Sequence, residues 1–269
     1  MYKRKDEILE LLRLNQVIIV QGETGCGKSV LLPEFLWNEC GGKVVCSQPR
    51  VTAAYNLAVQ KAKMWGGWIP GWVGFQGGSK RMTTPRTVVE YATHGSLVQR
   101  SVKHPKLEEY SGIVLDECHE IDEDFELLFF KVLEVAKVRP DFKVVCSSAN
   151  TDFVRSLLPQ AAFLTVSGRP FNVDKIVRIP PGNIDLEFTI GAVVEAISIS
   201  KKEDGGAVLV FLPDTTWIYE LKKKLETRAD LWVLPLHANL TTEDQSLCFE
   251  DPPHGKQLKI NDKNKNYPV

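Results

Sequence analysis

The residues VIIVQGETGCGKS, Val17–Ser29, give the clearest indication of fold class in this chain. GETGCGKS matches the pattern G-x-x-x-x-G-K-[ST] at every fixed position. In this pattern the glycines let backbone amides point at nucleotide phosphates, the lysine reaches the β and γ phosphates, and the serine hydroxyl can bind Mg²⁺. An apolar run precedes the loop and an amphipathic stretch follows it. The alternative, a glycine-rich turn with an incidental lysine, does not account for this context. The residues predicted to bind the triphosphate are Gly22, Glu23, Thr24, Gly25, Cys26, Gly27, Lys28 and Ser29.

Outward from the loop, short apolar runs alternate with longer amphipathic stretches, which is typical of a parallel sheet with crossover helices. Strands are expected at 17–21, 43–47, 88–92, 112–116, 143–147, 207–212 and 231–235. Helices are expected at 28–38, 51–64, 123–137, 186–201 and 215–228. The sequence therefore predicts an α/β protein whose first layer is continuous from residue 1 to about residue 170.

A second acidic element is expected wherever a phosphate loop binds a magnesium nucleotide. SGIVLDECHEID, at 111–122, provides one because its apolar run ends in Asp116 and Glu117. Asp116 is predicted to join Ser29 in holding Mg²⁺, and Glu117 to orient or deprotonate the attacking water. By itself such a pair is also typical of a solvated strand end. His119 lacks metal-ligand spacing with its neighbours, so we interpret it as a capping residue or as a link from the nucleotide site to other motifs.

Composition restricts the class of partner. The chain has 33 basic and 34 acidic residues and a formal net charge of -1, so any nucleic-acid contact is expected to be local. Its six cysteines form no CxxC pair, which favours free thiols over disulfides or a zinc site. No apolar stretch approaches the roughly 18 residues of a membrane span, and no signal peptide is evident. We expect an intracellular protein, in the nucleus or cytoplasm, with no membrane partner.

Five motifs, GETGCGKS, SQPR, THGSL, DECH and SSAN, occur in that order, and together they resemble the DEAH/DExH-box RNA helicases of superfamily 2. The resemblance covers about residues 1–250, including SGRPFNV at 167–173 and LPLHANLTTEDQ at 234–245. It implies a RecA-like P-loop NTPase fold with helices on both faces of the parallel sheet, followed by a partial second RecA-like domain. It also implies that ATP and Mg²⁺ are the cofactors and that RNA is the partner, bound mainly through its backbone.

The resemblance assigns roles only to positions that match a motif. In the nucleotide site it implies catalytic roles for Lys28, Glu117 and His119. It implies that single-stranded RNA is bound by Gln48, Pro49, Arg50, Thr93 and Gly95. It implies that Ser148 and Ala149 couple hydrolysis to strand movement.

The chain departs from the family pattern at five positions. Val51 replaces a second arginine, and His94 replaces an aspartate. Cys118 replaces the alanine of DEAH, Ile121 replaces an arginine, and Asn150 replaces a threonine. The changes at Val51 and Asn150 affect motifs for RNA grip and coupling. Nucleotide binding does not depend on them.

The expected domain order is an ATP-binding domain at 1–177, a turn-rich linker at 178–185, a partial second domain at 186–250 and a disordered end at 251–269. The resemblance implies that the chain stops before a family motif whose arginines reach the γ-phosphate from the second domain. Arginine fingers contribute about 10³ to 10⁵ in rate. We therefore expect slow hydrolysis by this chain alone.

Two alternatives remain open at this stage. The first is a noncatalytic nucleotide- or RNA-binding product of a shortened helicase. The second is a small-molecule kinase or another P-loop enzyme, against which SQPR and SSAN argue. A separate question concerns GGWIPGWVGFQGG at 66–78, whose aromatic residues either stack unpaired bases or belong to a turn and an edge strand packed on the first domain.

Overall fold

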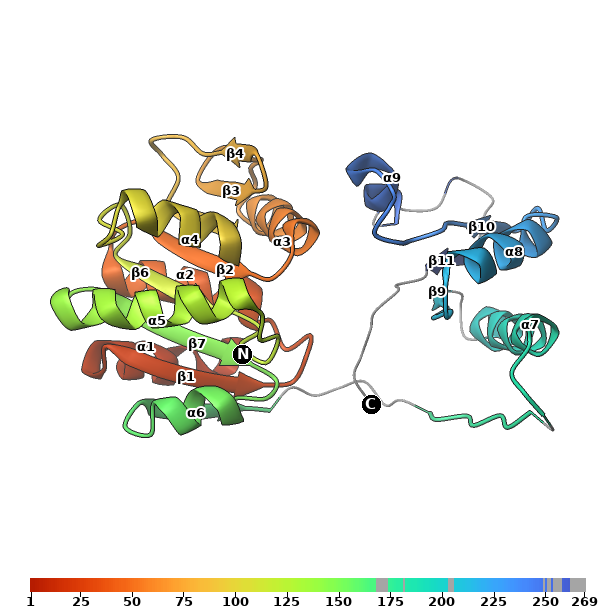
Figure 1. Ribbon diagram of the computed structural model, residues 1–269, viewed down its shortest axis with the longest axis horizontal. Helices are drawn as coiled ribbons and strands as arrows, with labels where there is room; N and C mark the ends of the chain where they lie inside the picture. Colours follow the sequence, from red (N-terminus) through yellow and green to blue (C-terminus); the bar gives the residue numbers. More distant parts are fainter. Residues whose placement is uncertain are drawn as a thin grey trace. The chain divides into compact units, whose positions relative to one another are not determined.

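The computed structural model describes residues 1–167, 174–180, 182–202, 206–248, 250, 253 and 258–261. The chain divides into two units, Met1–Val173 and Asp174–Val269 (Figure 1), and each is described by itself. The division falls shortly before the predicted linker at 178–185. Of SGRPFNV, which contributes to the family resemblance, residues 168–173 lie outside the described residues.

The first unit is built on one sheet in the order β4-β3-β5-β2-β6-β7-β1-β8. All neighbouring strands are parallel except the β3–β4 pair, so the carboxyl ends of the strands other than β4 meet at one edge of the sheet. We call this the carboxyl edge and the opposite one the amino edge. The strands are β1 (Val17–Gly22), β2 (Val44–Gln48), β3 (Val73–Gly77), β4 (Lys80–Met82), β5 (Val89–Thr93), β6 (Gly112–Leu115), β7 (Lys143–Ser148) and β8 (Ala162–Val166).

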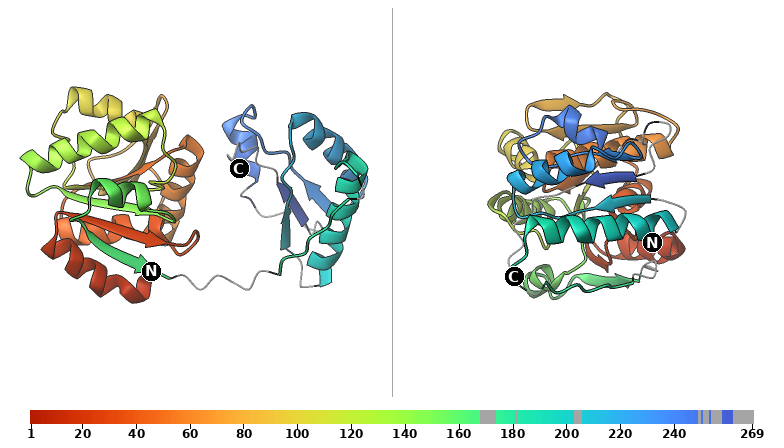
Figure 2. Two further views of the ribbon diagram at one scale, coloured as in Figure 1. Left: turned by 60° about the horizontal axis from the view of Figure 1, so that its bottom comes forward. Right: turned by 90° about the vertical axis from the view of Figure 1, so that its right-hand side faces the viewer.

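Helices cover both faces of this sheet (Figures 1 and 2). Alternation along β1 explains why: Ile18 and Val20 join one buried cluster with residues of α1, α2 and α3, whereas Ile19 joins the other with residues of α4, α5 and α6. The predicted α/β fold is thus confirmed. The helical elements are η1 (Tyr2–Arg4), α1 (Lys5–Leu14), α2 (Lys28–Cys40), α3 (Val51–Met64), α4 (His94–Lys103), α5 (Glu123–Val138) and α6 (Asp152–Leu157).

The second unit contains a parallel sheet in the order β10-β11-β9. Its core includes Ile197, Ile218 and Leu231. Its elements are α7 (Leu186–Lys202), β9 (Gly206–Leu209), α8 (Thr215–Leu225), β10 (Leu231–Val233), α9 (Thr242–Leu247) and β11 (Leu258–Asn261).

Strand β11, at Leu258–Asn261, departs from the expected disorder for four residues of the segment 251–269. The polar composition of that segment gave no indication of a strand. β11 pairs with β9 on one side and β10 on the other, so backbone N–H and C=O groups of both neighbours find hydrogen-bond partners. The other residues of 251–269, apart from 253, lie outside the described residues. Within the described part of the chain, no helix has the length and apolar character that a bilayer crossing requires.

The tryptophan-rich segment of the first unit forms a turn and then β3. The hairpin partner β4 occupies the sheet edge, so β3 is not the edge strand. Phe75 is buried and its ring lies 5.3 Å from that of Tyr55. Trp68 and Trp72 are exposed. The packing interpretation therefore holds for Phe75 but not for these two tryptophans.

Candidate nucleotide and nucleic-acid site

The phosphate loop joins β1 to α2 at the carboxyl edge of the sheet. Gly25 and Gly27 have φ angles of 83° and 89°, a left-handed conformation that favours glycine. Gly27 is also the N-cap of α2, so the loop leads directly into a helix N-terminus, whose free amides and dipole favour anions. A Cβ atom at Gly22 would lie 3.0 Å from the carbonyl oxygen of Val166, so a larger residue here would require the neighbouring backbone to shift.

Lys28 is held beneath this loop. Its side chain is nearly buried, at 5% exposure, and its Nζ donates to the carbonyl oxygens of Gly22 at 2.5 Å and Glu23 at 3.0 Å. Backbone carbonyls are neutral, so these bonds orient the ammonium group without neutralising it. Lys28 therefore brings an uncompensated positive charge to the place where a phosphate would be bound.

Asp116, which follows β6, is fully buried, and both of its carboxylate oxygens accept hydrogen bonds. Gln48 Nε2 at the end of β2 donates to Oδ2 at 2.7 Å, and Ser147 Oγ on β7 donates to Oδ1. Since β2 and β7 flank β6, the strand order brings these three side chains together. These two donors fix the orientation of the carboxylate.

Glu117 differs from its neighbour in backbone and environment. Its φ angle of 54° is unusual for a residue with a side chain. Burial, followed by the adjacent charge of Asp116, raises the pKa of the Glu117 carboxyl above its usual range. A carboxyl group with a raised pKa is better suited to accept a proton near neutral pH, which is what a general base does.

His119 links the acidic motif to the SSAN motif. Its Nδ1 lies 2.8 Å from Ser148 Oγ and 3.3 Å from Glu117 Oε2. Ser148 Oγ also accepts the backbone N–H of Asn150 at 3.1 Å. Three successive contacts therefore connect Glu117, through His119 and Ser148, to Asn150 in the loop after β7. Ala149, predicted with Ser148, is exposed.

The residues predicted to bind nucleic acid follow β2 and β5, which are paired with Gln48 opposite Thr93. Gln48 itself is buried, and its amide belongs to the Asp116 cluster. Arg50 is partly exposed and pairs with Glu120 at 2.8 Å, next to the acidic motif. Pro49, between them, is partly buried.

Thr93 and Gly95 form the start of α4. Thr93 Oγ1 caps the helix by accepting the backbone N–H of Ser96 at 3.4 Å. A Cβ atom at Gly95 would lie 2.5 Å from Asp124 Oδ2, so any larger residue here would require the exposed Asp124 side chain to move.

His94, where the family pattern has aspartate, lies between these two residues and is buried. Neither of its ring nitrogens makes a hydrogen bond to the described residues. Desolvation lowers the pKa of its imidazole, against the opposing effect of carboxylates at Asp122, Asp124, Asp116 and Glu120. The His94 Nδ1 atom lies 3.9 Å from Asp122 Oδ1.

Sequence reasoning missed two members of the site. Ser147 was passed over in favour of Ser148, although its hydroxyl binds Asp116. Thr151 Oγ1 donates to Gln21 Oε1 at 2.9 Å, tying the loop after β7 to the residue before the phosphate loop. Alternation along β7 signals that Ser147 and Ser148 point to opposite faces, but only the strand order shows which partner each one meets.

Comparison with known proteins agrees with this geometry. The family model of the DEAD/DEAH box helicase matches residues 3–155, more than half of the chain. The chain belongs to the DEAD/DEAH box helicase family. The matched region contains the phosphate loop, DECH and SSAN of this helicase-family chain.

Two solved structures of Escherichia coli proteins are similar to this DEAD/DEAH box family member. One is described as the DEAH/RHA helicase HrpB, with a TM-score of 0.83 and 26% identity over 98% of this chain and 34% of that protein. The other is described as the DExH-box NTPase HrpB, with a TM-score of 0.72 and 27% identity over 96% of this chain and 32% of that protein. The chain thus spans about a third of the length of these proteins.

Proposed function

We propose that the chain is a DExH-class, RNA helicase-like protein that binds Mg-ATP and single-stranded RNA on its first domain, residues 1–177. The observation that carries the proposal is the joining of the two halves of the site at one edge of one sheet. Asp116 of the nucleotide half accepts a hydrogen bond from Gln48 of the nucleic-acid half at 2.7 Å. A P-loop enzyme acting on a small metabolite does not require this connection.

The residues present fit a magnesium triphosphate. The left-handed glycines and the N-terminus of α2 offer backbone amides, and Lys28 offers a positive charge held by neutral carbonyls. Mg²⁺ prefers hydroxyl, carboxylate and water oxygens, and it would be held by Ser29 and Asp116. When bound, the metal would neutralise charge on the phosphate oxygens.

The chain's own groups supply the remaining chemistry. Lys28 would hold the β and γ phosphates, and Asp116, fixed by Gln48 and Ser147, would keep one orientation throughout. Glu117 would orient the attacking water and accept its proton, for which its raised pKa is suited. His119 would sense the charge of Glu117 and transmit it to Ser148.

RNA would be bound through its phosphates near Arg50 and the N-terminus of α4, with Thr93 and Gly95 shaping that terminus. Ser148 and Ala149 would couple this surface to hydrolysis.

A binding measurement with matched lysine variants tests the proposal. ATP with Mg²⁺ is titrated into the wild-type chain, Lys28→Ala and Asp116→Ala, with Lys106→Ala, an exposed turn lysine, as the control. We expect Lys28→Ala to weaken binding by about 100-fold, since a charge-assisted phosphate contact in a preorganised site is removed. Lys106→Ala should bind as wild type does. The proposal fails if the wild-type chain binds no ATP or if Lys28→Ala and Lys106→Ala behave alike.

A further inference from the structure

A concave surface lies in the first unit, outside the nucleotide and RNA residues. It is a cavity of about 590 Å³ lined chiefly by Trp65, Trp68, Pro70, Trp72, Pro85 and Arg86, and we call it the tryptophan groove. Trp68 and Trp72 are 78% and 59% exposed. Exposing two such large rings on one surface forgoes the free energy of burying them, and clustered exposed aromatics mark interaction sites.

The groove is held open by the backbone around it. Trp65 ends α3 and is anchored: its ring lies 5.5 Å from the ring of Trp37 and 4.7 Å from Lys61 Nζ. Gly66, with a φ angle of 69°, turns the chain away from the helix axis. The next tryptophan, Trp68, is thereby directed along a new path instead of continuing the packed face of α3.

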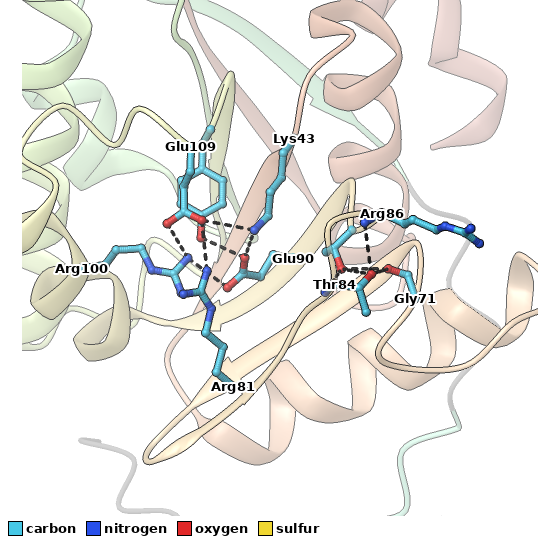
Figure 3. Close-up of polar contacts among 10 residues, drawn as sticks. Lys43, Gly71, Arg81, Thr84, Arg86, Glu90, Arg100 and Glu109 are labelled. Carbon is cyan, nitrogen blue, oxygen red and sulfur yellow. Dashed lines mark hydrogen bonds and ion pairs between the residues drawn. The ribbon is translucent and has the colours of Figure 1, made fainter.

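The far wall is fixed by a hydrogen-bonded turn (Figure 3). The Gly71 carbonyl accepts from Thr84 Oγ1 at 3.2 Å and from Thr87 Oγ1 at 2.8 Å. The Trp72 carbonyl accepts from the backbone N–H groups of Val88 and Val89 at 2.9 and 3.2 Å. Trp72 is therefore set at the start of β3 by the main chain, and its exposure is built into the fold.

The charge of the groove is one-signed. No acidic residue is among those that line it, and Arg86 is its one cation. The Arg86 backbone N–H donates to Thr84 Oγ1 at 3.2 Å, while its guanidinium extends away from the turn (Figure 3). Among the described residues no ion pair of Arg86 is found. The groove thus offers aromatic walls with one free positive charge at the rim.

Topology separates this groove from the RNA residues. Residues 65–72 precede β3, which is parallel to β5 and therefore begins at the amino edge. Arg50, Thr93 and Gly95 follow β2 and β5 at the carboxyl edge. A strand of RNA held at those residues does not reach the groove by following one edge, and a single arginine is a poor track for a phosphate backbone. These observations favour a protein ligand.

We propose that the tryptophan groove binds a proline-containing segment of a partner protein in the polyproline II conformation, with an acidic residue beside the prolines facing Arg86. Proline rings pack flat on indole rings, and a polyproline II segment loses little conformational entropy on binding. Indole N–H groups donate to its unpaired carbonyls. An aspartate or glutamate complements the one charge in the groove.

Fluorescence anisotropy of a labelled peptide of about ten residues, with prolines flanked by aspartates, tests the proposal on the full chain. Comparison peptides replace the prolines by glycine and serine, or the aspartates by lysine. We expect Trp68→Ala and Trp72→Ala each to weaken binding at least about tenfold, as truncation of aromatic anchors does. Tyr2→Ala, which removes an exposed aromatic ring elsewhere, should leave it unchanged. Arg86→Glu should reverse the preference between aspartate- and lysine-flanked peptides.

Trp68→Phe keeps an aromatic ring, so it controls for the possibility that Trp68→Ala binds less peptide only because it misfolds. Peptide binding should shift the tryptophan emission of the wild-type chain more than that of Trp68→Phe. ATP binding should be the same in both, which separates this test from that of the nucleotide site. The proposal is overturned if the wild-type chain does not bind the proline peptide or binds the glycine-serine peptide equally. It is also overturned if single-stranded RNA displaces the peptide. A chain that binds no peptide but self-associates, and loses that self-association in Trp68→Ala, would instead show that a second copy of the chain occupies the groove.

Discussion

At the carboxyl edge of the first sheet, Asp116, Lys28 and His119 are each bonded to neighbouring groups of the protein. At the amino edge, Trp68 and Trp72 are exposed, and the backbone of Trp72 accepts hydrogen bonds from Val88 and Val89. Polar catalytic groups need partners because an unpaired buried charge is costly and an unoriented one is ineffective. An aromatic docking surface needs the reverse, an open face on a rigid frame. Under the two proposals, one sheet would serve both needs because its two edges are formed by different loops.

The largest expected effect is on turnover. Glu117→Gln should lower steady-state phosphate release by about 10² to 10⁴, the usual contribution of a general base, and leave ATP affinity within about threefold. Glu108→Gln, an exposed glutamate in a turn, is the control. Trp68→Ala should leave turnover unchanged. Loss of turnover in Trp68→Ala would contradict the claim that the tryptophan groove and the nucleotide site act independently.

A pair of glycines sharpens the comparison at the phosphate loop. Gly27 and Gly41 cap the two ends of α2 with φ angles of 89° and 68°. Alanine at either position should lower the free energy of unfolding by about 1 kcal/mol, because each forces a side chain into the left-handed region. Only Gly27→Ala should weaken ATP binding, by about tenfold, because only Gly27 lies in the loop whose backbone amides point at the phosphates. Denaturant titration and ATP titration measure the two effects, and equal ATP affinities would contradict the assignment of the loop.

The smallest effect concerns His94 and pH. Burial lowers the pKa of its imidazole below the ordinary 6.5. Between that lowered pKa and pH 6.5, the unfolded chain therefore binds more protons than the folded one. Stability should therefore be complete above about pH 6.5 and decline as the pH falls below it. Melting temperatures across this range should fall less in His94→Leu than in the wild-type chain. The exposed His104→Ala serves as control, and identical pH profiles for all three would refute the prediction.

Local sequence predicted the elements that periodicity and turn chemistry define. Val51–Met64 was expected and observed with the same bounds, because alanines at helical spacing face the sheet. The glycines and Lys28 of the phosphate loop were predicted because phosphate binding requires these residue types at this spacing. Contacts that depend on strand order were not predictable: the side chain of Gln48 donates to Asp116, 68 residues away in sequence.

Two other features were hidden for physical reasons. β11 is short and lies in a polar segment, so its pairing with β9 and β10 outweighs its composition. The tryptophans at 65–72 carry no periodic signal that separates a packed ring from an exposed one. Gly71 and Trp72 are fixed by Thr84, Thr87, Val88 and Val89, and those contacts appear only once the hairpin of β3 and β4 is in place.

The central claim is that nucleotide and RNA are bound by one connected set of residues at the carboxyl edge. Its most direct test is the affinity of the chain for a labelled single-stranded RNA, measured by anisotropy with and without a nonhydrolysable ATP analogue and Mg²⁺. We predict a change of at least about fivefold, the lower end of typical coupling between sites, that is lost in Lys28→Ala and reduced in Ser148→Ala. An RNA affinity that is the same with and without the nucleotide would contradict the account.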